Sequence, residues 1–89
     1  QLPSFFMTQE KVQCPWEFRG KIMRDLLEEV RDRHVDTMDG IKIFYDSSWI
    51  LLLPSPEEPV FNIYAEAPSK EEAEMLVHQY TEKIRGMIG

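Results

Sequence analysis

The chain has 89 residues, of which 43% are hydrophobic and 29% are charged, as in one small globular domain. Its net charge of −6 argues against nucleic acid as a partner, because proteins that bind nucleic acid present a basic surface. No stretch approaches the ~20 apolar residues of a membrane span and no signal-peptide pattern opens the chain, so we expect a cytoplasmic protein without a membrane partner. One cysteine excludes an internal disulfide. Because the chain starts at Gln1, we expect it to be a piece of a longer polypeptide.

The first part of the chain predicts a strand followed by an amphipathic helix. Residues 6–13 (FMTQEKVQ) read as a strand that ends at Cys14-Pro15, and proline at a first helical position sacrifices no hydrogen bond. Apolar residues then recur with helical spacing and form one stripe: Ile22, Met23, Leu26, Leu27 and Val30. We expect this helix to fade near residues 33–34.

Turn residues divide the middle of the chain into four strand-like segments, which are 35–38, 41–45, 49–53 and 60–67. The dipeptide Asp39-Gly40 favours the positive φ angles of a two-residue hairpin turn. Segment 49–53 (WILLL) is apolar at every position, which is typical of a strand that is covered on both faces or docked against another domain. We favour a central strand over an exposed docking surface.

The last element is a helix that starts with the capping box SKEE, in which the Ser69 hydroxyl accepts a free amide hydrogen and Glu72 reaches back. Its apolar stripe is Ala73, Leu76, Val77, Tyr80, Ile84, Met87 and Ile88, and Gly86 and Gly89 lie where helices commonly stop. The element order is therefore β-α-β-β-β-β-α. We predict one α+β domain over 1–89, with a mainly antiparallel sheet of four to five strands and two helices on one face.

Three groups of residues in the second half form a spaced pattern. They are Asp39, Gly40, Ile41, Lys42 and Trp49 before the loop, Pro54, Ser55, Glu58 and Pro59 in the loop, and Tyr64, Glu66 and Ala67 after it. This pattern resembles the C-terminal domain of the α-D-phosphohexomutases, the phosphomannomutase and phosphoglucomutase superfamily. The resemblance covers residues 35–88, and residues 1–34 agree with it by element order alone.

The resemblance implies a role for the 54–59 loop. In working phosphohexomutases the corresponding loop holds the phosphate of the bound phosphosugar, while a phosphoserine of another domain exchanges phosphoryl groups. The family uses magnesium in another domain, so we expect no cofactor, no metal ligand and no catalytic residue in this chain. The partners implied are the remaining domains of the parent chain and a weakly bound phosphosugar.

The sequence departs from the family at the positions that bind the phosphate. Leu53 and Asn62 stand where the family has arginines, Pro56 replaces a glycine, and Glu57 replaces a threonine. Losing two charged hydrogen bonds costs ~3–6 kcal/mol, which is roughly two to four orders of magnitude in affinity. We therefore predict a degenerate phosphate loop, whose positions are Leu53, Pro54, Ser55, Pro56, Glu57, Glu58, Pro59 and Asn62.

The stretch VQCPWEFRGKIMRDLLEE in the first half has a second resemblance. It is similar to a motif in proteins that fuse a sugar-1-phosphate nucleotidyltransferase to a mutase-like C-terminal region. This resemblance implies a parent similar to mannose-1-phosphate guanylyltransferase with a phosphomannomutase-like tail.

Several single residues allow both a functional and a structural interpretation, and we favour the structural one for each. Cys14 is read as a packed thiol rather than a reactive one, and Ser55 as a brace of the turn rather than a ligand contact. Trp16 and Trp49 are read as buried in the core or at a domain contact rather than as lining a sugar pocket. The remaining candidates are His34 and His78 for a metal, Arg19, Lys21 and Arg24 for an anion, and Glu57-Glu58 for a cation; we expect solvated side chains at all of them.

Three hypotheses for function follow. We favour a structural and interaction module, that is, a degenerate mutase C-terminal domain that packs on its parent without binding phosphate. The second is the phosphosugar-binding domain of an active phosphohexomutase, and the third is an unrelated small-molecule sensor of ferredoxin-like build. Whether the parent is an enzyme stays open in all three, and the isolated domain is expected to be non-catalytic.

Overall fold

The computed structural model describes residues 5–32, 35–36 and 40–88. In chain order its elements are β1 (Phe6–Gln13), α1 (Trp16–Glu29), β2 (Val35–Asp36), β3 (Ile41–Phe44), β4 (Trp49–Pro54), β5 (Val60–Ala67) and α2 (Lys70–Ile88). The predicted element order is confirmed, and the bounds of β1 and β5 agree with the prediction. Expectations for residues 33–34, 37–39 and 89, including half of the Asp39-Gly40 turn, lie outside the described residues.

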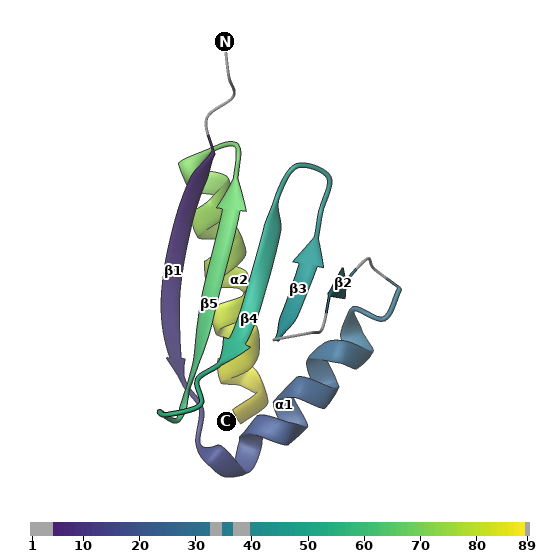
Figure 1. Cartoon of the computed structure of the whole chain (residues 1–89), viewed down its shortest axis with the longest axis vertical. Helices are drawn as coiled ribbons and strands as arrows, with labels where there is room; N and C mark the ends of the chain where they lie inside the picture. Colours follow the sequence, from purple (N-terminus) through teal and green to yellow (C-terminus); the bar gives the residue numbers. More distant parts are fainter. Residues whose placement is uncertain (1–4, 33–34, 37–39, 89) are drawn as a thin grey trace.

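The strands form one antiparallel sheet in the order β1-β5-β4-β3-β2 (Figure 1). β4 lies between β5 and β3, which confirms the central position predicted for segment 49–53. β1, the first strand in the sequence, lies at the edge beside β5, with Phe6 opposite Ala67 and Gln13 opposite Val60. The α+β class with an antiparallel sheet is therefore confirmed.

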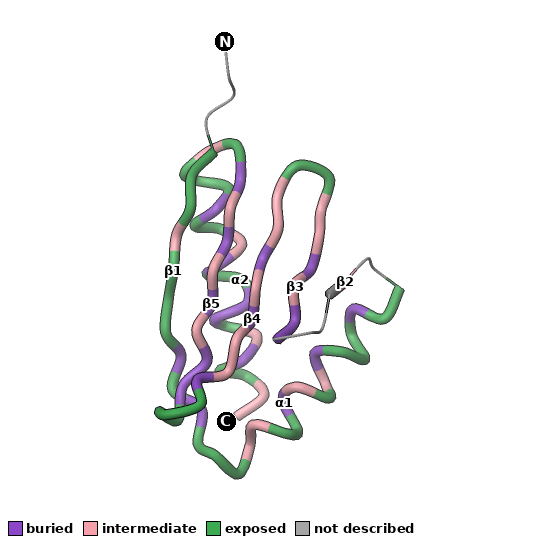
Figure 2. The backbone as a smooth tube through the Cα atoms, viewed as in Figure 1, coloured by how far each residue is buried: buried purple, intermediate pink, exposed green. Residues whose placement is uncertain are grey.

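Buried and half-buried residues alternate along β3, β4 and β5 (Figure 2), so one face of the sheet is buried and the other is open. Side chains alternate along the inner strands, and those on the buried face are Ile41, Ile43, Ile50, Leu52, Phe61, Ile63 and Ala65, all with no exposed surface. The opposite face, which we call the open face, carries the half-buried residues Lys42, Phe44, Trp49, Leu51, Leu53, Asn62, Tyr64 and Glu66. The expectation that segment 49–53 is covered on both faces is therefore wrong for this chain, because both helices contribute to the core on the same side.

The two helices complete the core on the buried face. α1 contributes Ile22 and Leu26, and α2 contributes Tyr80 and Ile84, all of which join the cluster of inward strand residues. α2 packs mainly on β1 and β5. In the described residues, no helix is long and apolar enough to cross a membrane.

Polar contacts hold the helices in place. The hydroxyls of Tyr45 and Tyr80 lie 2.6 Å apart and connect the end of β3 to α2. Lys83 of α2 forms an ion pair with Glu29 of α1. At the start of α2 the Glu72 N–H donates to the Ser69 hydroxyl at 3.2 Å, as the capping box predicts.

One sequence expectation about helix ends is wrong and one is confirmed. α1 ends at Glu29 instead of continuing toward residue 33, and the Val30 N–H closes it by donating to the Leu26 carbonyl at 3.2 Å. α2 ends at Ile88, close to Gly86, as expected.

The reason given for Gly40 is also wrong. None of the glycines in the described residues has a positive φ angle, so no left-handed turn requires Gly40. Instead, a Cβ atom at this position would lie 2.6 Å from the Leu52 carbonyl oxygen. Glycine is needed here because the chain entering β3 approaches the backbone of β4 closely.

Candidate functional site

The 54–59 loop joins β4 to β5 at the end of the sheet where α1 begins (Figure 1). The Ser55 N–H donates to the Val60 carbonyl at 3.0 Å, and the Val60 N–H donates to the Glu58 carbonyl at 2.8 Å. The Ser55 Oγ accepts the N–H groups of Glu57 and Glu58 at 3.3 and 3.2 Å. The three prolines have no N–H, so each backbone N–H from residue 54 to residue 60, all of them described, has its acceptor inside this segment.

Ser55 is therefore a brace of the loop, which agrees with its favoured reading. Its side chain is 7% exposed, and its Oγ satisfies two backbone donors. Replacing Ser55 by alanine is expected to lower the free energy of unfolding by about 1–3 kcal/mol, because two loop amides lose their acceptor. Urea denaturation followed by circular dichroism measures this change. Ser47, an exposed turn serine, provides the control, and equal stability of S55A and S47A would contradict the bracing role.

Arg19 contacts this loop, which the sequence reading missed. The Arg19 Nη2 donates to the Glu58 carbonyl at 2.9 Å, and its guanidinium carbon lies 4.2 Å from the centroid of the Trp16 ring. The start of α1 reaches the loop because the Cys14 N–H donates to the Pro59 carbonyl at 2.7 Å. The expectation of a solvated helix face is wrong for Arg19.

The two positions where the family carries arginine lie opposite each other. Leu53 of β4 pairs with Asn62 of β5, and Asn62 pairs with Lys11 of β1, so the three form one row across the open face. Lys11 is the cation of this row, and its Nζ lies 3.4 Å from the Glu58 carboxylate. Among the described residues, the Asn62 Oδ1 has no hydrogen-bond partner although it is buried. The two positions that the resemblance singled out, Leu53 and Asn62, are therefore direct neighbours on two strands. The row that they form with Lys11 carries one positive charge.

Cys14 has the structural role that was favoured for it. The side chain has no exposed surface, and burial raises the pKa of its thiol, although the nearby Arg19 opposes this shift. A raised pKa keeps the thiol protonated at neutral pH, whereas the thiolate is the nucleophile. Cys14 is a packed core residue.

The tryptophans differ from each other. Trp16 is 51% exposed, so core burial is wrong for this residue. Trp49 is half-buried on the open face, where its indole Nε1 donates to the Glu66 Oε1 at 3.0 Å and the Lys42 Nζ lies 4.3 Å from its ring centroid.

No metal site forms in the part of the chain that the structure describes, where no group of three or more histidine, cysteine, aspartate or glutamate side chains could hold an ion. His78 is exposed on α2, and His34 lies outside the described residues. Lys21 pairs with Asp25 along α1, at 3.2 Å.

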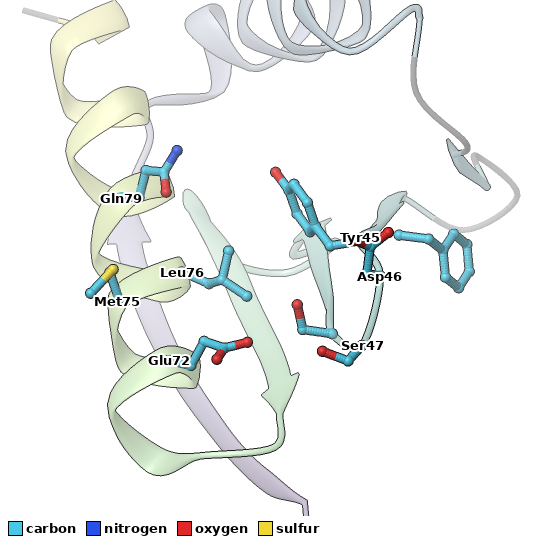
Figure 3. A pocket seen from close by; sticks show the side chains of 9 residues that line it. Tyr45, Asp46, Ser47, Glu72, Met75, Leu76 and Gln79 are labelled. Carbon is cyan, nitrogen blue, oxygen red and sulfur yellow. The ribbon is translucent and has the colours of Figure 1, made fainter.

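A separate groove of about 730 Å³ lies at the other end of the sheet, between the β3–β4 turn and the first half of α2 (Figure 3). Asp46 and Ser47 border it on one side, and Glu72, Met75 and Gln79 on the other. Its described lining includes two carboxylates and neither lysine nor arginine. This groove is unsuited to a phosphate group, because like charges at contact range repel by about 1–4 kcal/mol.

The fold and the 54–59 loop define an α+β domain of the kind expected from the phosphohexomutase resemblance. Comparison with known proteins supports this class. The chain is 33% identical over 90 residues to a probable phosphoglucosamine mutase of Methanopyrus kandleri and 35% identical over 92 residues to one of Pyrococcus furiosus. It is 32% identical over 83 residues to a phosphopentomutase of Thermococcus kodakarensis. These relatives carry mutase names, and no protein-family model matches the chain.

These matches cover most of this chain but only a small part of each relative. They include 99%, 99% and 85% of this chain, so the similarity reaches into residues 1–34, where element order alone had suggested it. The chain spans only 20%, 20% and 18% of the length of these relatives.

Proposed function

We propose that this chain is the C-terminal domain of a phosphohexomutase-like protein, in which the 54–59 loop is structural and does not bind phosphate. The observation that carries the proposal is the use of the loop's backbone N–H groups within the loop itself, around the Ser55 Oγ. An anion site made by a loop requires such donors to point toward the ligand. Here an anion would have to displace the hydrogen bonds that hold the loop together.

The charges around the loop support the same proposal. Glu57 and Glu58 add two carboxylates to a loop where a phosphate would carry the same sign, and each repels it by about 1–4 kcal/mol at contact range. Lys11 and Arg19 are the nearby cations, and both already contact Glu58. Residues 53 and 62, where the family has arginines, are Leu53 and Asn62 in this chain.

The open face favours the interaction part of the proposal. Trp49, Leu51 and Leu53 of β4 and Tyr64 of β5 are half-buried there, and the described helices pack on the opposite side. A contiguous apolar area of this kind commonly marks an interface with another protein surface. We propose that the remaining domains of the parent chain pack on it.

The test is titration of the isotopically labelled chain with millimolar mannose 1-phosphate, followed by NMR chemical shifts. We expect no saturable shift changes at residues 53–59 or at residue 62. Neutral mannose at the same concentration is the control for weak contacts with the sugar ring. Saturable shifts with the phosphosugar alone would overturn the proposal.

A second candidate is the phosphosugar-binding domain of an active phosphohexomutase. It is favoured by the mutase names of the relatives and by the two cations, Lys11 and Arg19, that the fold brings to the loop. A phosphoserine loop and a metal-binding carboxylate cluster elsewhere in the parent sequence would favour this candidate. A parent with a mannose-1-phosphate guanylyltransferase region is a further hypothesis, which rests on residues 12–29 alone because the relatives above carry mutase names.

A further inference from the structure

β1 presents an unpaired edge in the described part of the chain, where β5 is its only strand neighbour. The first half of this edge carries no charged side chain and includes Phe6 and Met7, which are 43% and 59% exposed. Its charged residues, Glu10 and Lys11, both lie in the second half. An edge strand with free N–H and C=O groups and exposed apolar side chains is a template for pairing with another strand.

A groove of about 290 Å³ runs between this edge and α2, and we call it the edge groove. Thr8 of β1 lines it together with Glu74, Thr81 and Arg85 of α2. Thr81 is 4% exposed, and its Oγ1 has no hydrogen-bond partner among the described residues. An unpaired buried hydroxyl is costly, so the edge groove is a place where a further polar group would be stabilising.

We propose that a second copy of this chain adds its own β1 to this edge, antiparallel and about a two-fold axis, with Gln9 opposite Gln9. In this register Phe6 of one copy faces Val12 of the other, and Met7 faces Lys11, so no like charges are opposite each other. A shift of one residue per strand toward the C-terminus would place Glu10 against Glu10, which is unfavourable. The chosen register also pairs seven residues, from Phe6 to Val12.

The position of α2 fits this pairing. α2 packs over both β1 and β5, so its axis lies about half a strand spacing inside β1. Paired strands lie about 4.8 Å apart, so the two α2 helices would lie about 10 Å apart across the contact between the two β1 strands. That separation is close to the usual packing distance of two helices, about 8–10 Å.

The edge groove contains Glu10, Glu74, His78 and Arg85, and the two charges on α2, Glu74 and Arg85, would face each other across a two-fold axis. β1 and α2 run in the same direction, with Glu74 in the first half of α2 and Arg85 near its end (Figure 1). A two-fold axis reverses this order in the second copy, so the acidic part of one helix faces the basic end of the other. The net charge of −6 on each copy opposes association, so we expect added salt to strengthen the dimer.

Sedimentation of the 89-residue chain over a range of concentrations tests the proposal, with three variants. Met7→Lys places a lysine opposite Lys11 at both ends of the contact between the two β1 strands, and we expect it to raise the dimer dissociation constant about tenfold. Met7→Glu places a carboxylate opposite Lys11 instead, and we expect it to lower this constant. Met75→Lys is the matched control, because Met75 is 68% exposed and lies outside the edge groove. A chain that stays monomeric at millimolar concentration, or equal effects of M7K and M75K, would overturn the proposal.

Disulfide trapping tests the register itself. Directly opposite residues in an antiparallel pair have Cα atoms about 4.5–5.5 Å apart, within the range of a disulfide, so Gln9→Cys is expected to form a covalent dimer under mild oxidation. Lys11→Cys is the control on the same strand, because two copies of residue 11 would lie about 14 Å apart. Faster crosslinking of K11C than of Q9C would show the register to be wrong. The inference is independent of the proposed function, so its failure leaves that proposal unchanged.

Discussion

Replacing both Leu53 and Asn62 by arginine is expected to give the chain measurable affinity for a phosphosugar. The two positions are a cross-strand pair on the open face, and Lys11 continues their row, so the variant brings three cations together beside the 54–59 loop. Each charged hydrogen bond to a phosphate contributes about 1.5–3 kcal/mol, so two arginines correspond to roughly two to four orders of magnitude in affinity. Arginine can donate two parallel hydrogen bonds to one phosphate, which lysine cannot.

Calorimetric or NMR titration with mannose 1-phosphate measures the gain. The matched control is Met75→Arg with Gln79→Arg, which adds the same charge to exposed positions of α2 beside the other groove. We expect the control to bind no more phosphosugar than the natural sequence. If L53R/N62R and the control respond equally, net charge rather than the row determines binding, and the inferred site is wrong. Adding Pro56→Gly and Glu57→Thr to L53R/N62R should increase affinity further, because glycine restores a backbone donor and threonine removes a repelling charge.

Replacing Phe61 by alanine is expected to produce the largest loss of stability. Phe61 has no exposed surface and lies opposite Val12 of β1 and Pro54 of β4. Deleting a buried phenylalanine ring costs about 3–5 kcal/mol, because apolar contacts are lost and a cavity remains. A domain of this size has a free energy of unfolding of about 5–15 kcal/mol, and each kilocalorie shifts the melting temperature by about 4–8 °C.

Thermal and urea denaturation, followed by circular dichroism, measure this loss. Phe5→Ala is the matched control because the Phe5 side chain is 51% exposed, and we expect its melting temperature to stay close to that of the natural sequence. A loss below about 1 kcal/mol for F61A would mean that the site collapses around the smaller side chain, and it would contradict the packing described for β5.

Strand and helix positions were predictable because they depend on local patterns. Segment 60–67 was predicted as a strand with the bounds of β5, in which Phe61, Ile63 and Ala65 are inward and Asn62 and Tyr64 outward. Helix ends were less predictable. α1 stops after Glu29 although its charged and apolar pattern continues, because the end of a helix depends on where the chain must turn toward its next strand.

The candidate site was predictable in part. The resemblance pointed to residues 53 and 62 without showing that they pair across two strands. Arg19 could not be assigned to the loop from its spacing, since the contact with Glu58 spans 39 residues of sequence. Trp16 was expected in the core or at a domain contact, and the start of α1 leaves its ring at the surface beside the Arg19 guanidinium.

Local sequence was sufficient for the element order and for the bounds of β1 and β5, because both depend on neighbours a few positions away. The uncovered face of β4, the exposed edge of β1 and the loop contacts of Arg19 and Lys11 depend instead on which distant elements meet. Segment 49–53 shows the difference most clearly. Five consecutive apolar residues suggested cover on both faces, yet both helices pack on one side, so Ile50 and Leu52 are buried while Leu51 and Leu53 remain half-exposed. Burial is a property of the surrounding elements, and local hydropathy indicates only which residues tolerate it.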